Sequence, residues 1–175
     1  MSLGFTFSYP TVQRAIDHGE LIRWTKGFDN PNTEGRDCAD MLRTSLKRFN
    51  VPVKLSSIIN DTTGTLIASN YVDPRTKIAC IFGTGCNAAY MESIGNIPKL
   101  SNLDLPADEQ MVINCEYGAF DSFEHRYLGS LRSKYDVEID LSSNKPNQQA
   151  FEKMIAGKYL GEIYRLVLCE LVYDG

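Results

Sequence analysis

The sequence predicts an α/β fold, and three observations support this prediction. Short apolar runs typical of strands alternate with segments whose apolar residues recur at helical spacing. One such run ends abruptly at Asn60-Asp61 in polar residues that favour the start of a helix. From Gln148 to Tyr173 a long apolar face recurs at helical spacing. In α/β folds of this kind, ligands bind where strands end.

The first sixty residues are expected to form strands around one helix. Leu3–Ser8 is expected to be a strand that Tyr9-Pro10 ends, and Gly19–Phe28 a short strand or hairpin. The spacing predicts a helix over Glu34–Phe49, through Cys38, Met41, Leu42, Ser45, Leu46 and Phe49. A further strand is expected at Val53–Ile59.

A helix is expected to follow Asp61-Thr62-Thr63, which offer capping side chains, with Leu66, Ile67 and Tyr71 on one side. Gly83-Thr84-Gly85 should form the turn of a hairpin. Further strands are expected at Lys77–Phe82, Cys86–Met91, Met111–Cys115 and Val137–Asp140, with a loop at Gly95–Gln110.

The last expected element is one continuous helix over Gln148–Tyr173. Its apolar face consists of Phe151, Met154, Ile155, Tyr159, Ile163, Leu166, Val167 and Leu171. Gly157 and Gly161 lie four residues apart inside it, and each costs about 1 kcal/mol relative to Ala. Close packing against a neighbouring backbone would explain both glycines.

Composition excludes several function classes. The chain has 175 residues, 43% of them hydrophobic, and a net charge of −4, which provides no field for nucleic acid or anionic membranes. The five cysteines form no CxxC pair and the two histidines lie far from any cysteine pair, so neither a zinc site nor a disulfide framework is expected. Reduced thiols and the lack of a signal peptide predict a cytoplasmic protein.

Two motifs suggest chemistry at the ends of strands. Asp61 could serve only as a helix cap, the commoner role of such a residue, or as a base that takes a proton from a hydroxyl. The Gly83-Thr84-Gly85 turn could be only a tight turn, or it could offer backbone N–H groups to a phosphate. By residue type alone, Glu116 and Glu152 are surface charges.

Five segments together resemble the hexokinase and glucokinase family, in its fungal form, from Leu3 to about Leu171. They are LGFTFSYP with the following WTKGF, INDTTGT, IFGTGCN, INCEYGAF, and QQAFEKM with GKYLGE. The resemblance is weakest over Ser122–Asn147. It implies an actin-like, ribonuclease-H-like fold and transfer of the γ-phosphoryl group of MgATP to the 6-hydroxyl of a hexose, the first step of glycolysis.

The resemblance also implies roles for particular residues. Asp61 would be the catalytic base, and Lys26 would offset the charge that develops near the transferred group. The hexose would be held by Ser8, Thr25, Lys26, Asn60, Asp61, Asn87, Glu116 and Glu152. Gly83, Thr84 and Gly85 would meet the phosphates of ATP, and no residue of this chain is expected to bind the Mg²⁺ directly.

The same resemblance predicts which parts of the family's fold are present. Residues 1–60 would be the C-terminal part of the small lobe, and residues 61–175 the N-terminal half of the large lobe. Neither a D-x-G-G-T-N loop, which helps to hold magnesium, nor the adenosine-binding segment occurs, so the isolated chain is expected to be inactive. Exposed strand edges, beginning with Leu3–Ser8, are expected to favour self-association.

Two other functions fit the same motifs. The parent protein could be a sugar-sensing regulator that binds a hexose without phosphorylating it, although no catalytic motif has decayed. It could also be a kinase for another sugar, such as N-acetylglucosamine. The sequence does not distinguish the preferred hexose or the oligomeric state.

Overall fold

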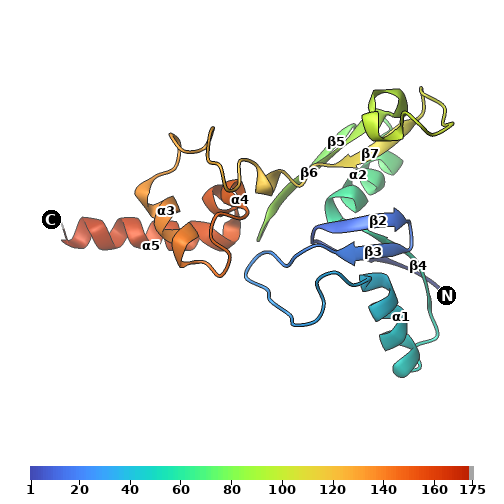
Figure 1. Cartoon of the computed structure of the whole chain (residues 1–175), viewed down its shortest axis with the longest axis horizontal. Helices are drawn as coiled ribbons and strands as arrows, with labels where there is room; N and C mark the ends of the chain where they lie inside the picture. Colours follow the sequence, from blue (N-terminus) through green and yellow to red (C-terminus); the bar gives the residue numbers. More distant parts are fainter. Residues whose placement is uncertain (174–175) are drawn as a thin grey trace. The chain divides into compact units, whose positions relative to one another are not determined.

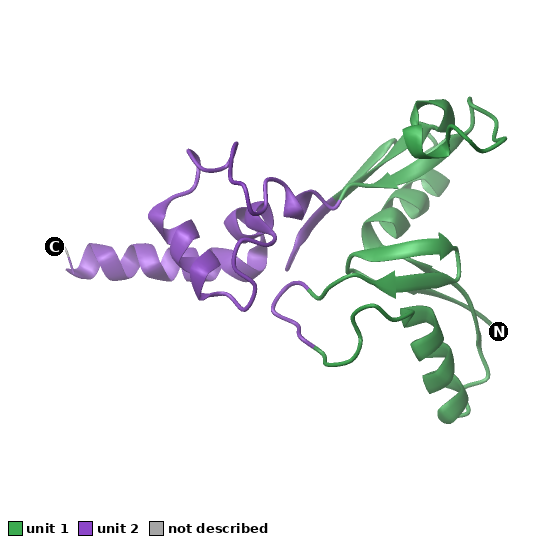
Figure 2. Cartoon of the chain, in the orientation of Figure 1, with its two compact units in different colours: residues 1–24, 30–80, 88–115 green, residues 25–29, 81–87, 116–175 purple. Residues whose placement is uncertain are grey.

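The computed structural model describes residues 1–173, which belong to two compact units. Unit 1 contains Met1–Trp24, Asn30–Cys80 and Ala88–Cys115; unit 2 contains Thr25–Asp29, Ile81–Asn87 and the chain from Glu116 onward (Figure 2). Neither unit is one continuous stretch, so segments distant in sequence meet within each. These units do not coincide with the expected lobes, residues 1–60 and 61–175, and the division into lobes stays a prediction.

Unit 1 is built around two parallel strands, β1 (Ser2–Thr6) and β4 (Lys54–Ile59) (Figure 1). Thr6 pairs with Ile59, so the two strands end side by side. Both expected strands are therefore confirmed, with ends shifted by one or two residues. The helix that precedes β4, α1 (Cys38–Arg48), begins later than expected because Asp37 is its N-cap and accepts a hydrogen bond from the Ala39 amide at 3.0 Å.

A hairpin of β2 (Thr11–Ala15) and β3 (His18–Leu21) lies between β1 and α1 in sequence. The expected strand at Gly19–Phe28 is thus wrong beyond Leu21, where the chain leaves the sheet. A core joins the hairpin, α1 and β4, and consists of Leu21, Trp24, Cys38, Ala39, Leu55 and Ile58. This core holds β4, and therefore the residues that follow it, in a fixed position.

Helix α2 (Asp61–Val72) follows β4 directly, as expected. The next three strands, β5 (Ile78–Phe82), β6 (Cys86–Ser93) and β7 (Gln110–Asn114), form a sheet in the order β5-β6-β7. Leu66 of α2 packs in a small core with Ala79 and Ala89. The prediction that Leu66, Ile67 and Tyr71 form one apolar side of α2 is wrong in part, because Ile67 and Tyr71 are exposed.

The expected loop at Gly95–Gln110 contains the short 3₁₀ turns η1 (Ile94–Asn96) and η2 (Pro98–Leu100).

The expected strand at Val137–Asp140 is wrong, because these residues belong to helix α3 (Lys134–Ser142) in unit 2. A capping box explains the helix. Ser133 accepts a hydrogen bond from the Asp136 amide, and the Asp136 carboxylate accepts one from the Ser133 amide at 2.7 Å. This reciprocal pair satisfies two amide groups that a helix start otherwise leaves open.

The expected helix over Gln148–Tyr173 is two helices, α4 (Ala150–Ile155) and α5 (Gly157–Tyr173), with Ala156 extended between them. The Gly157 amide donates to the Gly83 carbonyl at 2.9 Å instead of continuing the helix. A Cβ on Gly157 would lie 3.0 Å from that carbonyl oxygen, so close packing is confirmed for Gly157. It is wrong for Gly161, where a Cβ would meet no described atom within 4 Å.

Unit 2 also contains the 3₁₀ turn η3 (Tyr117–Ala119), and α4 packs on η3, α3 and α5. Among residues 1–173, no helix combines the length and apolar character that a membrane span requires.

Candidate functional site

Asn60 and Asp61 stand at the junction between β4 and α2 in unit 1. The Asn60 side chain caps the helix by accepting a hydrogen bond from the Thr62 amide at 2.8 Å, and Asp61 is the first helical residue. One Asp61 oxygen also lies 2.9 Å from the Thr62 amide nitrogen. The capping role that could have been assigned to Asp61 therefore falls to Asn60, and Asp61 is held at the positive end of the helix dipole, where a carboxylate is stabilised.

Ser8 lies at the same edge of unit 1. β1 and β4 run parallel, and the hydrogen bond from the Phe7 amide to the Ile59 carbonyl, 2.8 Å long, extends their pairing to the last residue before Asn60. The residues that follow the two strands therefore emerge at one edge, the place where doubly wound sheets bind ligands. The structure thus brings Ser8, Asn60 and Asp61 to a common edge.

Thr25 and Lys26 belong to unit 2, on a short loop. Thr25 is buried, and Lys26 and Gly27 both have positive φ angles, 60° and 79°. A positive φ is uncommon for a residue with a side chain, and such conformations cluster at functional sites. This conformation turns the chain sharply between Thr25 and Phe28, which are joined by a 3.1 Å backbone hydrogen bond.

Glu152, on α4, is only 2% exposed. Its Oε2 accepts a hydrogen bond from the Cys86 amide at 3.1 Å, whereas its Oε1 is buried and has no hydrogen-bond partner among residues 1–173. Burial raises the pKa of this carboxyl, and the Cys86 amide, the Lys26 charge and the Gln149 side chain oppose the rise. A buried carboxylate oxygen without a partner is costly, and a ligand hydroxyl would satisfy it.

Gly85 allows Lys26 and Glu152 to approach the same point of the chain. A Cβ on Gly85 would lie 2.5 Å from Glu152 Oε2 and 2.6 Å from Lys26 Cε, distances that no real Cβ tolerates. The neighbouring Cys86 is buried, and burial, followed by the Glu152 charge, raises the pKa of its thiol to about 11. Cys86 is therefore a neutral thiol rather than a nucleophile.

Asn87 and Glu116 hold each other through two hydrogen bonds. The Asn87 side-chain amide donates to Glu116 Oε1 at 3.2 Å, and its oxygen accepts from the Glu116 amide at 2.9 Å. Glu116 has a φ of 52°, again in the left-handed region. The pair fixes the orientation of both side chains in unit 2, with Asn87 almost fully buried.

The Gly83-Thr84-Gly85 turn is closed by a 2.9 Å hydrogen bond from the Gly83 amide to the Gly85 carbonyl. Its carbonyls at Gly83 and Thr84 accept from the amides of Gly157 and Lys158, at 2.9 and 3.3 Å. The amides of Thr84 and Gly85 donate to no group among residues 1–173, which suits a turn that receives an anion.

Sequence reasoning missed Lys158. The Lys158 amide donates a hydrogen bond to the carbonyl of Thr84, in the candidate phosphate turn. A Cβ on Gly27 would lie 3.1 Å from Lys158 Nζ, so the Lys158 ammonium group borders the loop that carries Lys26. The GKYLGE segment is part of the family resemblance, but the sequence does not indicate that a new helix begins at Gly157 and places Lys158 beside the Gly83-Thr84-Gly85 turn.

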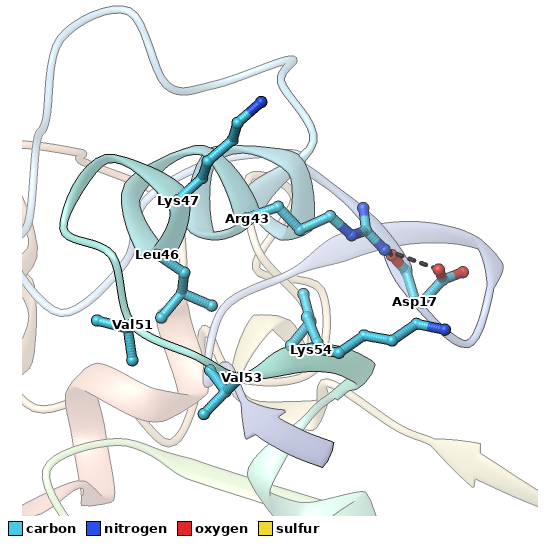
Figure 3. Close-up of a pocket in the computed structure, with 8 residues that line it drawn as sticks. Asp17, Arg43, Leu46, Lys47, Val51, Val53 and Lys54 are labelled. Carbon is cyan, nitrogen blue, oxygen red and sulfur yellow. Dashed lines mark hydrogen bonds and ion pairs between the residues drawn. The ribbon is translucent and has the colours of Figure 1, made fainter. Parts of the chain in front are cut away.

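A cavity of about 450 Å³ in unit 1 lies apart from these residues (Figure 3). It is lined by α1 and the start of β4, and Arg43 forms an ion pair with Asp17 there at 2.7 Å. None of the candidate site residues lines it. Residues 1–173 also contain no group of three or more His, Cys, Asp or Glu side chains arranged to hold a metal ion.

Comparison with known proteins gives consistent results for the whole chain. The hexokinase family models match residues 1–71 and residues 77–175. A hexokinase from Emericella nidulans is 58% identical over 98% of this chain and 34% of its own length, and hexokinase-1 from Saccharomyces cerevisiae is 52% identical over 100% of this chain and 36% of its own length.

A solved structure, described as the hexokinase from Schistosoma mansoni complexed with glucose, is similar with a TM-score of 0.88 and 40% identity. The match covers 99% of this chain and 38% of that chain. The chain thus spans about a third of the length of the curated relatives it matches. The similarity confirms the expected actin-like, ribonuclease-H-like fold of a partial hexokinase.

Proposed function

Because this chain belongs to the hexokinase family, we propose that it carries the sugar-binding and catalytic core of an ATP-dependent hexose kinase. The reaction moves the γ-phosphoryl group of MgATP to the 6-hydroxyl of glucose or a related hexose, at the first step of glycolysis. The observation that carries the proposal is Glu152, a buried carboxylate with one oxygen bound to a backbone amide and the other without a partner.

A hexose supplies the kind of donor that this oxygen requires. Its hydroxyl groups donate hydrogen bonds, and bonds to a charged acceptor are stronger than neutral ones. Glu116 offers a second carboxylate, already oriented by Asn87, and Thr25 a buried hydroxyl. In the proposal these three residues of unit 2 bind sugar hydroxyls, and Ser8 and Asn60 are the sugar-binding candidates of unit 1.

Asp61 acts in this proposal as the general base. Its carboxylate takes the proton from the 6-hydroxyl, the hydroxyl oxygen forms the new bond to the γ-phosphorus, and the bond to the leaving oxygen breaks to release ADP. The rigid β4–α2 junction supports this role, because a base must be held in place relative to its substrate.

MgATP supplies the phosphoryl group and the divalent charge. The open amides of Thr84 and Gly85 suit its phosphates, and Lys26 and Lys158 provide positive charge near developing negative charge. We place the reaction in the cytoplasm, which the five free cysteines support.

We predict that Asp61→Ala in a full-length hexokinase containing this segment lowers kcat by at least about 10²-fold, the lower range for general-base assistance. Glucose affinity, measured by titration calorimetry, should change much less. The matched control is Asp73→Ala at the opposite end of α2, where the carboxylate pairs only with the exposed Arg75. Retention of more than about a tenth of the turnover in Asp61→Ala would remove Asp61 as the base.

A further inference from the structure

A buried ionic cluster lies next to the sugar-binding candidate in unit 2. The side chains of Asp140, Lys153 and Arg132 are 2%, 5% and 9% exposed. Charged side chains are rarely buried to this degree, and burial of each costs free energy that only close partners offset. The proposed reaction assigns none of the three a role.

The Lys153 ammonium group and both carboxylate oxygens of Asp140 are fully engaged in hydrogen bonds. Lys153 Nζ donates to Asp140 Oδ1 at 2.5 Å, to the Ser143 hydroxyl at 2.9 Å and to the Lys145 carbonyl at 2.8 Å, which uses all three ammonium protons. Asp140 Oδ2 accepts from Arg132 at 3.0 Å, and Asp140 Oδ1 from the Asn147 amide at 3.0 Å. The cluster therefore ties α3 to α4 and to both ends of the connection between them.

Lys153 is the residue after Glu152, on a helix of only six residues. Gln149, at the start of α4, has a φ of 53° and provides no side-chain cap. So short a helix has little stability of its own, and its position depends on its tertiary contacts. Polar contacts from three of its residues hold it: the Ala150 amide donates to the Ser122 hydroxyl, Glu152 accepts from the Cys86 amide, and Lys153 donates to Asp140 on α3.

We propose that the Lys153–Asp140 pair is a positioning device for Glu152, which holds α4 so that the unpartnered Glu152 oxygen meets the hexose. The proposal rests on the proposed sugar-binding role of Glu152. Neither Lys153 nor Asp140 touches the hexose; they act through the placement of α4. Aromatic packing of Phe151 on Tyr117 and Phe120, with ring centroids 5.7 and 6.5 Å apart, restrains the same helix, but these contacts lack the directionality of the Lys153 hydrogen bonds.

The test is Lys153→Met in a full-length hexokinase containing this segment. Met keeps much of the apolar stem, and Asp140 keeps its partner Arg132, so no buried charge is left alone. We expect the Kd and KM for glucose to rise about tenfold to a hundredfold, the range for losing one hydrogen bond to a charged group. The KM for ATP should rise less than the KM for glucose, because the Gly157 and Lys158 amides at the start of α5 also hold the proposed phosphate turn.

The matched control is Lys134→Met, which removes an ion pair between α3 and Glu170 of α5 without touching α4. It should leave the glucose Kd unchanged even if it lowers the melting temperature. A milder variant, Ser143→Ala, removes one of the three acceptors of the Lys153 ammonium and keeps the test valid if Lys153→Met does not fold. It should raise the glucose Kd by a smaller factor in the same direction.

Three outcomes are decisive. A raised glucose Kd in folded Lys153→Met or Ser143→Ala, with an unchanged value in Lys134→Met, supports the positioning role. An unchanged glucose Kd in both folded cluster variants, while Glu152→Gln weakens glucose binding, overturns the positioning role alone. If Glu152→Gln itself leaves the glucose Kd unchanged, the sugar-binding role of Glu152 fails, and the positioning role fails with it.

Discussion

At the scale of single residues, the surroundings of Glu152 determine when its carboxyl can accept hydrogen bonds. Burial raises its pKa above the ordinary value of 4.5, and Glu116 also raises it, while the Cys86 amide, Lys26 and Gln149 lower it. The raised pKa is the net result, so protonation begins at a higher pH than for an exposed glutamate. A protonated carboxyl loses acceptor strength toward a sugar hydroxyl.

This shift predicts a pH dependence of hexose binding. In the proposed role the carboxylate form of Glu152 binds the hexose, so hexose affinity is fully present above the raised pKa of Glu152 and is lost as pH falls through it. Calorimetric titration of a full-length hexokinase containing this segment with glucose, over roughly pH 4.5 to 7.5, should show affinity declining at a pH above 4.5.

The control for the pH dependence is Glu152→Gln. It should bind glucose more weakly at neutral pH, by about 1.5–3 kcal/mol, and show a flatter dependence in the acidic range. A variant with the same acidic decline as the wild type would show that a group other than Glu152 causes the decline.

The residue types of the candidate site could be predicted from motifs, but most of their partners could not. Glu152 and Cys86 are 66 positions apart, and only the folded chain reveals that the Cys86 amide donates a hydrogen bond to the Glu152 carboxylate. Asp140 and Lys153 resemble surface charges in the sequence, because no local pattern distinguishes a buried ion pair. The sequence could have predicted Asn60 as the N-cap of α2, because Asn is among the preferred N-cap residues.

At the scale of elements, the sequence predicts a helix or strand correctly where residues close together in the chain determine it. The β4–α2 junction and the hairpin of β5 and β6 follow local patterns, and both were predicted. The break between α4 and α5 was not, because it depends on the tertiary hydrogen bond from Gly157 to Gly83. Helix α3 was missed although Ser133 and Asp136 form a capping box that its sequence contains.

The two glycines of α5 give a matched pair of substitutions. Gly161→Ala should raise the free energy of unfolding of the 175-residue chain by about 1 kcal/mol, because a helical Ala is favoured over Gly and a Cβ there meets no described atom within 4 Å. Gly157→Ala should lower it, because the Cβ would lie 3.0 Å from the Gly83 carbonyl oxygen. Urea denaturation measures both, and equal effects of the two substitutions would contradict the packing at Gly157.

At the scale of the whole molecule, much apolar surface remains exposed. Helix α5 has no buried residue among its 17, and its exposed side chains include Leu160, Tyr164, Leu168 and Leu171. In unit 1, β1 and β4 have only each other as neighbours within residues 1–173. A two-stranded sheet with open edges and an exposed apolar helix face are both sites at which other chains can associate.

These surfaces predict how the isolated 175-residue chain behaves. It should self-associate as its concentration rises, because open edges and apolar faces can pair with other copies. Sedimentation velocity at increasing concentration measures this association. A monomer at all concentrations would contradict the prediction that these edges and faces bind one another.

The isolated chain should also lack hexose kinase activity. Phosphoryl transfer requires a base, an aligned acceptor, a held nucleotide and its metal ion. Residues 1–173 offer Asp61, the sugar-binding candidates and one phosphate turn, whereas the chain covers only 34–36% of the length of the curated hexokinases it matches. Loss of alignment alone can cost about 10²-fold in rate. A coupled assay with glucose and MgATP tests this; turnover that elutes with the monomer and disappears in Asp61→Ala would contradict it, because only a complete site could then be present.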